Sequence, residues 1–279
     1  MKVVEGLAEL REARESLTKP VGLVPTMGTL HEGHLSLVRR AKSECASVGV
    51  SIFVNPAQFG PTEDLDAYPM DLERDLDLLA GEGVDLVWTP TAAEMYDSGY
   101  QTWVEVEELA QYLEGEIREG HFRGVATVAT KLFNSFQPDR AYFGQKDAQQ
   151  SIVIRRMVED LNFPIEVIVC PTVREADGLA ISSRNSYLSP EERRAAPVLY
   201  RALLAASQLF STGEREADRL RAEMETVLAT EPRARPEYAS VADPATLEEQ
   251  HGPIEQALLS MAVFVGKTRL IDNLTVGDK

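Results

Sequence analysis

Short apolar runs alternate with amphipathic segments through the first two thirds of the chain. The short runs, rich in Val, Ile and Phe, predict strands over Val21–Pro25, Val48–Phe53, Val84–Thr89, Arg140–Phe143 and Ile165–Cys170. The segments between them have helical periodicity and predict helices over Leu35–Ser47, Leu72–Glu82, Val125–Phe136 and Gln149–Leu161. Strands that alternate with helices are typical of an α/β fold, so we expect a doubly wound, Rossmann-like parallel sheet with helices on both faces.

The pattern changes after Cys170. Segments rich in Ala, Leu, Arg and Glu predict helices over Glu191–Phe210 and Ala217–Leu228. Three later runs predict short strands over Tyr238–Ala242, Ala257–Val265 and Thr268–Asn273. We therefore expect a Rossmann-like nucleotide- and substrate-binding domain over residues 1–175 and a smaller α+β C-terminal domain over residues 176–279.

Composition narrows the partners and the compartment. With 45 acidic and 28 basic residues the chain has a net charge of −17, which repels a phosphate backbone and makes nucleic acid an unsuitable partner. No apolar run approaches the roughly 18 residues of a membrane span, and the N-terminus lacks the apolar stretch of a signal peptide. Cys45 and Cys170 lie in apolar surroundings, which predicts reduced core thiols and a cytoplasmic protein.

The first candidate site follows the strand that ends at Pro25. A loop containing Gly28 leads to a helix that is expected to open near His34. A helix start binds anions through free N–H groups and the positive end of the helix dipole, and His31 and His34 could direct ring N–H donors at the same anion. Phosphate is the expected ligand, although two capping histidines would give the same pattern. The spacing His-x-Gly-His resembles the nucleotide-binding signature of the superfamily that includes class I aminoacyl-tRNA synthetases and small nucleotidyltransferases.

Two further polar stretches follow predicted strands. Asn55 and Gln58 come after the second strand, where a carboxamide can hold a hydroxyl or a carboxylate. Lys146 and Asp147 stand at a turn between strand and helix, positions suited to phosphate oxygens and ribose hydroxyls. The structural alternatives are an Asn-Pro turn with a solvated Gln, and a surface Lys–Asp pair.

A fourth stretch falls at the expected domain junction. Ser182 and Ser183 are followed by Arg184. Hydroxyl donors and a guanidinium suit a mobile clamp that follows charge developing on a leaving pyrophosphate. A polar linker is the structural alternative.

In chain order these motifs resemble the pantothenate synthetase family. The resemblance covers nearly the whole chain, through residues 25–34, 53–59, 64–69, 121–125, 143–150 and 171–188. Its most specific parts are Val-Arg-Glu-Ala-Asp-Gly-Leu-Ala from Val173 and Ser-Ser-Arg-Asn from Ser182. The family's reaction joins pantoate and ATP into pantoyl-adenylate with release of pyrophosphate, after which β-alanine attacks to give pantothenate and AMP.

The resemblance also implies roles for individual residues. The residues expected to contact the ATP phosphates and to carry catalysis are His31, His34, Lys146, Ser182, Ser183 and Arg184. The remaining ATP-binding residues, with the ribose at Gly144 and Asp147 and the adenine near Val173, are Pro25, Thr26, Met27, Gly28, Gly144, Gln145, Asp147, Val173 and Ile181. Pantoate is expected at Gln58 and Gln150, beside Pro25 and Met27, with Asn55, Tyr68 and Arg118 near the substrates.

Magnesium is expected to bridge phosphate oxygens, with Asp75 as a possible contact. Two departures from the family pattern lie close by, because Met70 replaces a usual Arg and Arg74 stands where an acid is frequent. Both change the charge of the region where the resemblance implies that the metal or β-alanine is handled.

The implied chemistry needs no protein nucleophile, because the substrate carboxylate attacks the α-phosphorus and the protein aligns the reactants and neutralises charge. Closure of the C-terminal domain, acting as a lid, would keep water from the acyl-adenylate. The family further implies a homodimer. Two alternatives remain: a small-molecule nucleotidyltransferase, which would lack the Gln58 and Gln150 pair, and a non-catalytic adenylate-binding regulator.

Overall fold

The computed structural model describes residues 1–60, Leu65 and residues 68–277, so positions 64, 66 and 67 of the family-like stretch 64–69 lie outside the described residues. The chain divides into two compact units. The N-terminal unit comprises Met1–Gln145 and Gln149–Pro171, and the C-terminal unit comprises Lys146–Ala148 and Thr172–Lys279. A lid role for residues 176–279 stays a prediction.

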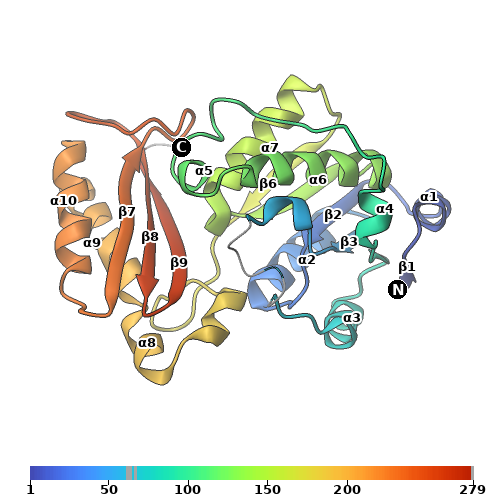
Figure 1. Cartoon of the computed structure of the whole chain (residues 1–279), viewed down its shortest axis with the longest axis horizontal. Helices are drawn as coiled ribbons and strands as arrows, with labels where there is room; N and C mark the ends of the chain where they lie inside the picture. The colour runs from blue at the N-terminus through green and yellow to red at the C-terminus, as the bar shows by residue number, and fades with distance from the viewer. Residues whose placement is uncertain (61–64, 66–67, 278–279) are drawn as a thin grey trace. The chain divides into compact units, whose positions relative to one another are not determined.

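A six-stranded parallel sheet forms the centre of the N-terminal unit (Figure 1). Its strands, in the order β1-β4-β3-β2-β5-β6, are β1 (Lys2–Val4), β4 (Leu86–Trp88), β3 (Ser47–Ile52), β2 (Val21–Thr26), β5 (Arg140–Gly144) and β6 (Glu166–Cys170). The chain runs outward from β2 through β3 to β4 and then returns to β5 on the other side of β2. The carboxyl ends of β2 and β5 therefore flank a topological switch point, where ligands bind in such sheets.

Helices cover both faces of this sheet. The helices of the N-terminal unit are α1 (Leu7–Glu15), α2 (Glu32–Glu44), α3 (Leu72–Gly81), α4 (Ala92–Met95), α5 (Glu114–Ile117), α6 (His121–Phe136) and α7 (Ala148–Asp160). On one face Val38 of α2 packs with Val48 and Val50 of β3. On the opposite face Phe136 of α6 lies over Gly49, where a Cβ would be 2.0 Å from the ring. The predicted doubly wound fold is confirmed.

Several predicted boundaries are wrong. The helix expected over Leu35–Ser47 spans Glu32–Glu44, because Cys45 is already extended and Ser47 belongs to β3. The prediction also missed β1 and α1, where charged and apolar residues are mixed in the first seventeen positions.

Among the described residues, the helices are too short or too polar to cross a bilayer.

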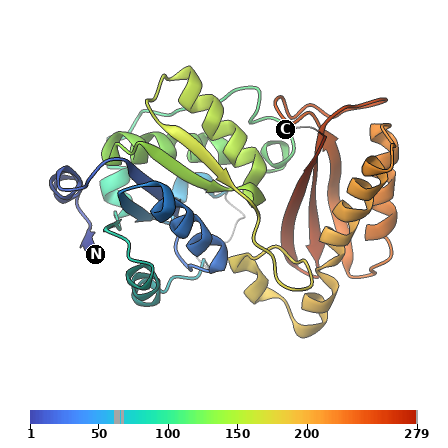
Figure 2. The same ribbon diagram turned by 180° about the vertical axis from the view of Figure 1, so that it is seen from behind.

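The C-terminal unit is built on a three-stranded antiparallel sheet, ordered β7 (Ala234–Ala242), β8 (Ala257–Val265) and β9 (Thr268–Val276). Helices α9 (Val198–Ser211) and α10 (Ala217–Leu228) cover one face of it, as Figure 2 shows from behind. The shorter elements are α8 (Pro190–Ala195) and the 3-10 turn η4 (Ser183–Tyr187). This confirms the predicted smaller α+β part.

The single helix predicted over Glu191–Phe210 is wrong. It is broken between α8 and α9, where Pro197 takes the N-cap position of α9. Proline lacks the N–H that a continuous helix needs, so the chain starts a new helix there.

Candidate functional site

The loop after β2 brings the two predicted phosphate-binding histidines together at the start of α2. His31 is the N-cap residue of α2, and its ring stacks on that of His34 with centroids 4.1 Å apart. The His31 backbone N–H donates to Nδ1 of His34 at 3.4 Å. Two imidazoles therefore stand side by side at the positive end of a thirteen-residue helix, an arrangement suited to an anion.

Two glycines allow this loop to form. Gly28 has a φ of +86°, in the left-handed region that favours glycine. At Gly33 the constraint is contact, because a Cβ would lie 2.9 Å from Cε1 of His31. The glycine between the histidines thus lets the His31 ring lie against the helix backbone.

A buried carboxylate braces the same loop. Both oxygens of Asp75, in the first turn of α3, accept backbone hydrogens, one from Thr29 and one from Leu30, each at 2.7 Å. The side chain is 1 % exposed, and Arg74 lies 3.8 Å from it. These bonds fix the backbone that leads into His31.

The next strand end carries a pair of buried carboxamides. Asn55 caps the 3-10 turn η1 (Pro56–Gln58), and its Oδ1 accepts the N–H of Ala57 at 3.2 Å. Its Nδ2 donates to Oε1 of Gln58 and to the carbonyl of Gly124, both at 3.1 Å. The Nε2 of Gln58 points to the sulfur of Met27 at 3.0 Å. The predicted residues are thus linked in a row, Asn55 to Gln58 and Gln58 to Met27.

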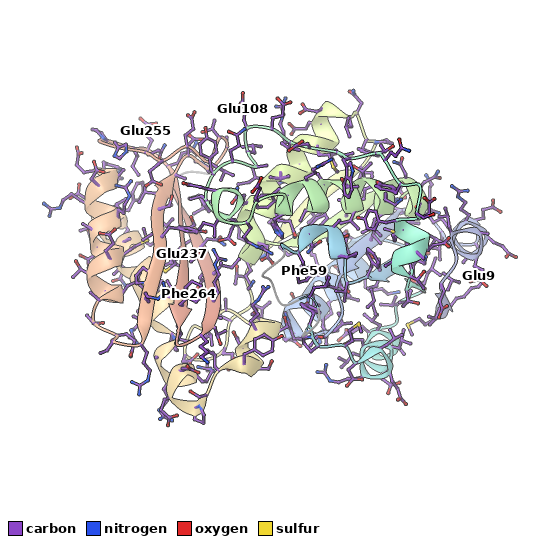
Figure 3. The ribbon with its side chains drawn as sticks, viewed as in Figure 1. Glu9, Phe59, Glu108, Glu237, Glu255 and Phe264 are labelled. Atoms are coloured by element: carbon purple, nitrogen blue, oxygen red, sulfur yellow. The ribbon has the colours of Figure 1, made fainter. Side chains whose placement is uncertain are left out.

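The start of α6 supports this pair. His121 joins the backbone carbonyl of Gln58 through Nδ1 at 2.8 Å and the guanidinium of Arg118 through Nε2 at 3.0 Å. A carbonyl only accepts, so Nδ1 carries the hydrogen and Nε2 accepts from Arg118. Gly124 is required because a Cβ there would lie 2.2 Å from the carbonyl oxygen of Ala57. Phe59, labelled in Figure 3, follows Gln58 in the chain. Its ring meets that of Tyr68 edge-on, with centroids 5.9 Å apart.

Adjacent glutamines at the start of α7 have different environments. The Gln149 side chain is buried, accepting the N–H of Glu114 at 3.0 Å and donating to the carbonyls of Leu109 and Tyr112 at 2.9 and 2.7 Å. Gln150, the predicted substrate residue, is partly exposed. The Gln149 side chain therefore holds the chain segment before α5 in place. This structural role differs from the substrate-binding role predicted for Gln150.

In the C-terminal unit the predicted cation Lys146 is held through its backbone. It lies in the turn η3 (Gln145–Asp147), and its ammonium is 3.3 Å from Asp147. The side chain of Asn273, in β9, donates to the Lys146 carbonyl at 2.9 Å. A strand residue 127 positions later therefore holds the backbone of Lys146 in place.

The predicted clamp also belongs to the C-terminal unit. The loop from Val173 folds back on itself, and the N–H of Ile181 donates to the Val173 carbonyl at 3.0 Å. Ser182 caps η4, accepting the N–H of Arg184 at 3.3 Å. Ser183 and Arg184 open that turn. The predicted adenine and phosphate contacts Val173, Ile181, Ser182, Ser183 and Arg184 are thus parts of one local structure.

A buried ion pair anchors this loop to the sheet. The Arg174 guanidinium contacts the two carboxylate oxygens of Asp272 at 2.6 and 2.8 Å and lies 3.8 Å over the Tyr200 ring. Burial raises the pKa of Asp272, while the hydrogen bonds from Arg174 act in the opposite direction. The loop's shape is therefore set by a charge that is out of contact with water.

The sequence predictions missed several residues that support the site. His121, Tyr96, Arg174, Asp272 and Asn273 each bond to a predicted site residue or to the loop that carries one. His121 and Arg174 lie within the family-like stretches 121–125 and 171–188, but no role was predicted for either. No motif marks Tyr96, Asp272 or Asn273, because their partners lie far away in the sequence. Among the described residues there is no cluster of three or more His, Cys, Asp or Glu that could hold a metal ion.

Comparisons with known proteins bear on the whole chain. The family model described as pantoate-beta-alanine ligase matches residues 2–275. A pantothenate synthetase of Chloroflexus aggregans is 60% identical over 275 residues, covering 98% of this chain and 99% of the relative. The pantothenate synthetase of Moorella thermoacetica is 55% identical over 279 residues, covering 99% of each chain.

Solved structures agree in fold. The crystal structure of pantothenate synthetase from Thermus thermophilus matches with a TM-score of 0.95 and 50% identity over 100% of both chains. A pantoate-beta-alanine ligase from Francisella tularensis, complexed with beta-gamma ATP and beta-alanine, matches with a TM-score of 0.80 and 35% identity, covering 98% of this chain and 97% of that one.

Proposed function

The chain belongs to the pantoate-beta-alanine ligase family, and from that premise we propose how its residues carry out the ATP-dependent ligation of pantoate to β-alanine. Two features of the N-terminal unit carry the proposal: the pair of stacked imidazoles at the start of α2, and the buried carboxamides of Asn55 and Gln58, which contact the loop before α2 through Met27. The first suits a phosphate and the second suits a small hydroxy acid.

The first step forms the acyl-adenylate. A carboxylate oxygen of pantoate attacks the α-phosphorus, the bond from that phosphorus to the bridging oxygen breaks, and pyrophosphate leaves with the electron pair. His31, His34, Lys146 and the Ser182–Arg184 turn would stabilise the charge that moves onto the phosphate oxygens. Aligning the reactants supplies the rest of the rate enhancement, because the substrate itself is the nucleophile.

The second step forms the amide. The β-alanine amine attacks the acyl carbon, AMP leaves with the electrons of the acyl–oxygen bond, and the nitrogen releases a proton. Gln58 and Gln150 would hold the pantoyl group, beside Pro25 and Met27, through both steps. Asn55, Tyr68 and Arg118 would lie near the substrates. Gly144, Asp147 and Val173 would receive the adenosine, together with Thr26, Gly28, Gln145 and Ile181.

Magnesium is part of the proposal as a companion of ATP. Among the described residues there is no cluster of three or more His, Cys, Asp or Glu for a protein-built magnesium site, and each oxygen of the candidate ligand Asp75 accepts one backbone hydrogen, which leaves only its remaining lone pairs for a metal. A metal held mainly by phosphate oxygens and water needs few protein carboxylates. Asp75 as a metal contact stays a prediction.

We also propose a cytoplasmic homodimer. The two cysteines are free and buried, as expected for a protein of a reducing compartment. A lid role of the C-terminal unit is proposed on chemical grounds, since an acyl-adenylate must be protected from water. The dimer would be tested by sedimentation, and the lid by hydrolysis of the intermediate when β-alanine is omitted.

The phosphate assignment is tested by pantoate-dependent exchange of pyrophosphate into ATP. We expect His34→Ala and Lys146→Ala each to lower the exchange rate by roughly 100-fold or more, because each removes a group that stabilises transition-state charge. The matched control is Lys267→Ala, which replaces an exposed lysine of the same unit as Lys146 and should leave the exchange rate unchanged. Wild-type rates in both site variants would remove these residues from the phosphate site.

The substrate assignment is tested separately with Gln58→Ala. The KM for pantoate should rise while the KM for ATP stays near the wild-type value. Mass spectrometry with each acid omitted in turn would then show whether pantothenate forms only when both are present. A product that retained a nucleotidyl group without an amide would favour the nucleotidyltransferase alternative, and no turnover of ATP would favour the regulator.

A further inference from the structure

A tyrosine outside the predicted site bonds to the carboxamide pair. Tyr96 directly follows α4, and its hydroxyl lies 2.8 Å from Oδ1 of Asn55. An amide oxygen only accepts, so the Tyr96 O–H is the donor. Burial raises the pKa of Tyr96, which keeps the hydroxyl protonated.

The orientation of the Asn55 amide follows from the backbone groups around it. One end faces the N–H of Ala57 at 3.2 Å, which requires an oxygen there. The other end faces the carbonyl of Gly124 at 3.1 Å, which requires the NH2 group. Since backbone groups cannot exchange roles, Oδ1 points to Tyr96 and Nδ2 points to Gln58.

The orientation of the Gln58 amide follows from that of Asn55. The second hydrogen of Asn55 Nδ2 donates to the Gln58 side chain at 3.1 Å, so the atom there is Oε1. The Gln58 NH2 group is thereby turned toward the Met27 sulfur, 3.0 Å away. Sulfur is a weak acceptor, which a substrate oxygen would readily replace. The backbone of Gln58 is separately fixed by His121.

From these bonds we propose that Tyr96 is a positioning residue: its O–H holds the Asn55 amide in the place that the backbone groups of Ala57 and Gly124 orient it for, and Asn55 in turn fixes the Gln58 amide so that it presents hydrogen-bond donors to an acceptor oxygen of the pantoate. The inference rests on the proposed function of Gln58. We call this series of hydrogen bonds the relay, and all of its donors point the same way. The Tyr96 hydroxyl donates to Oδ1 of Asn55, Nδ2 of Asn55 donates to Oε1 of Gln58, and Nε2 of Gln58 would donate to the substrate. Each member is held in the donor state that the next requires.

The surroundings of Tyr96 permit a clean test. Its ring packs with Phe53, Tyr100 and Trp103 at centroid distances of 6.4, 5.0 and 6.1 Å, and the Lys131 ammonium lies 5.5 Å from its centre. Tyr96→Phe removes the hydroxyl alone and keeps these packing contacts. Tyr100→Phe makes the same chemical change in the neighbouring ring and is the matched control.

For Tyr96→Phe we expect the KM for pantoate to rise by about tenfold, the loss of one aligned hydrogen bond, with the KM for ATP within twofold of wild type. Tyr100→Phe should change neither value. In a Gln58→Ala background the Tyr96→Phe change should have no further effect, because the group that it positions is gone. A purely structural role would instead add to the Gln58→Ala defect.

The possible failures are distinguishable. If Gln58→Ala raises the KM for pantoate but Tyr96→Phe leaves it within twofold of wild type, the relay is overturned and the proposed function stands. Additive effects of the two changes would overturn it as well. If Gln58→Ala itself leaves pantoate binding unchanged, the assignment of Gln58 in the proposed function fails first.

Discussion

In the N-terminal unit Asp75 holds the histidine loop by accepting two backbone hydrogens at 2.7 Å, whereas in the C-terminal unit Asp272 holds the Val173–Arg184 loop through the guanidinium of Arg174 at 2.6 Å. Both carboxylates are buried, at 1 % and 3 % exposure. Asp75 touches the backbone that it positions, and Asp272 acts through another side chain that stacks on Tyr200.

The difference lies in what compensates the buried charge. Asp75 is stabilised chiefly by oriented N–H dipoles, which fix the backbone and lose little freedom when they bind. Asp272 is stabilised by a buried counter-charge, whose attraction must offset the desolvation of two ions. Removing one partner of the Arg174–Asp272 pair should therefore lower stability more than weakening the bonds of Asp75. A small displacement of Asp75, in contrast, should be passed more directly to the candidate phosphate-binding residue His31.

The largest expected effect is on the ion pair. Arg174→Met leaves the Asp272 carboxylate buried without its counter-ion, so the free energy of unfolding should fall by about 3–5 kcal/mol in urea denaturation. Arg174→Met combined with Asp272→Leu should recover much of that loss, because no buried charge remains. The exposed pair of Arg194 and Glu191 is the control, and Arg194→Met should cost less than about 1 kcal/mol. A loss that small for Arg174→Met would remove the contrast between the units.

A smaller effect is expected at the other carboxylate. Asp75→Asn keeps the shape but turns an NH2 group toward a backbone N–H, which should cost about 2 kcal/mol of stability. Because the loop leads directly to His31, pyrophosphate exchange should fall as well. Denaturation and exchange measured on the same preparation test both parts. Full exchange activity despite lost stability would show that the histidines do not depend on this brace.

A still smaller effect on stability, with a disproportionate effect on activity, is expected for Gly33→Ala. Alanine generally favours a helix over glycine by about 1 kcal/mol, which offsets the crowding of a Cβ 2.9 Å from the His31 ring. Exchange should nevertheless fall by about tenfold because the ring must move. Gly81→Ala, where a Cβ would meet nothing within 4 Å, is the control and should leave exchange unchanged.

The smallest effect on stability is expected at Asp218, a surface carboxylate that contrasts with the two buried ones. Hydrogen bonds from His251 and Arg221 lower the pKa of Asp218 from its ordinary 3.8 to about 2. A depressed pKa adds stability that is complete above the unfolded value and is lost as the pH falls toward about 2. Asp218→Asn should therefore flatten the pH dependence of unfolding between about pH 4 and pH 2. An unchanged acid limb would show that other carboxylates dominate there.

The local periodicity of the chain predicted most of the sheet and the helices that flank it, since side-chain spacing alone distinguishes buried strands from amphipathic helices. The break at Pro197 was available in the sequence but was outweighed by the surrounding helix-forming residues. Strand β1 could not be predicted in the same way, because a three-residue edge strand acquires its structure by pairing with β4.

At the candidate site, the sequence by itself determined the loops that suit an anion, because glycines, histidines and a helix start act within a few positions of one another. The tertiary structure alone decided what holds those loops. Asp75 lies 46 positions from Thr29, Tyr96 lies 41 from Asn55, and Asp272 lies 98 from Arg174. Such partners meet only after the strand order has brought distant segments together, so no local pattern records them.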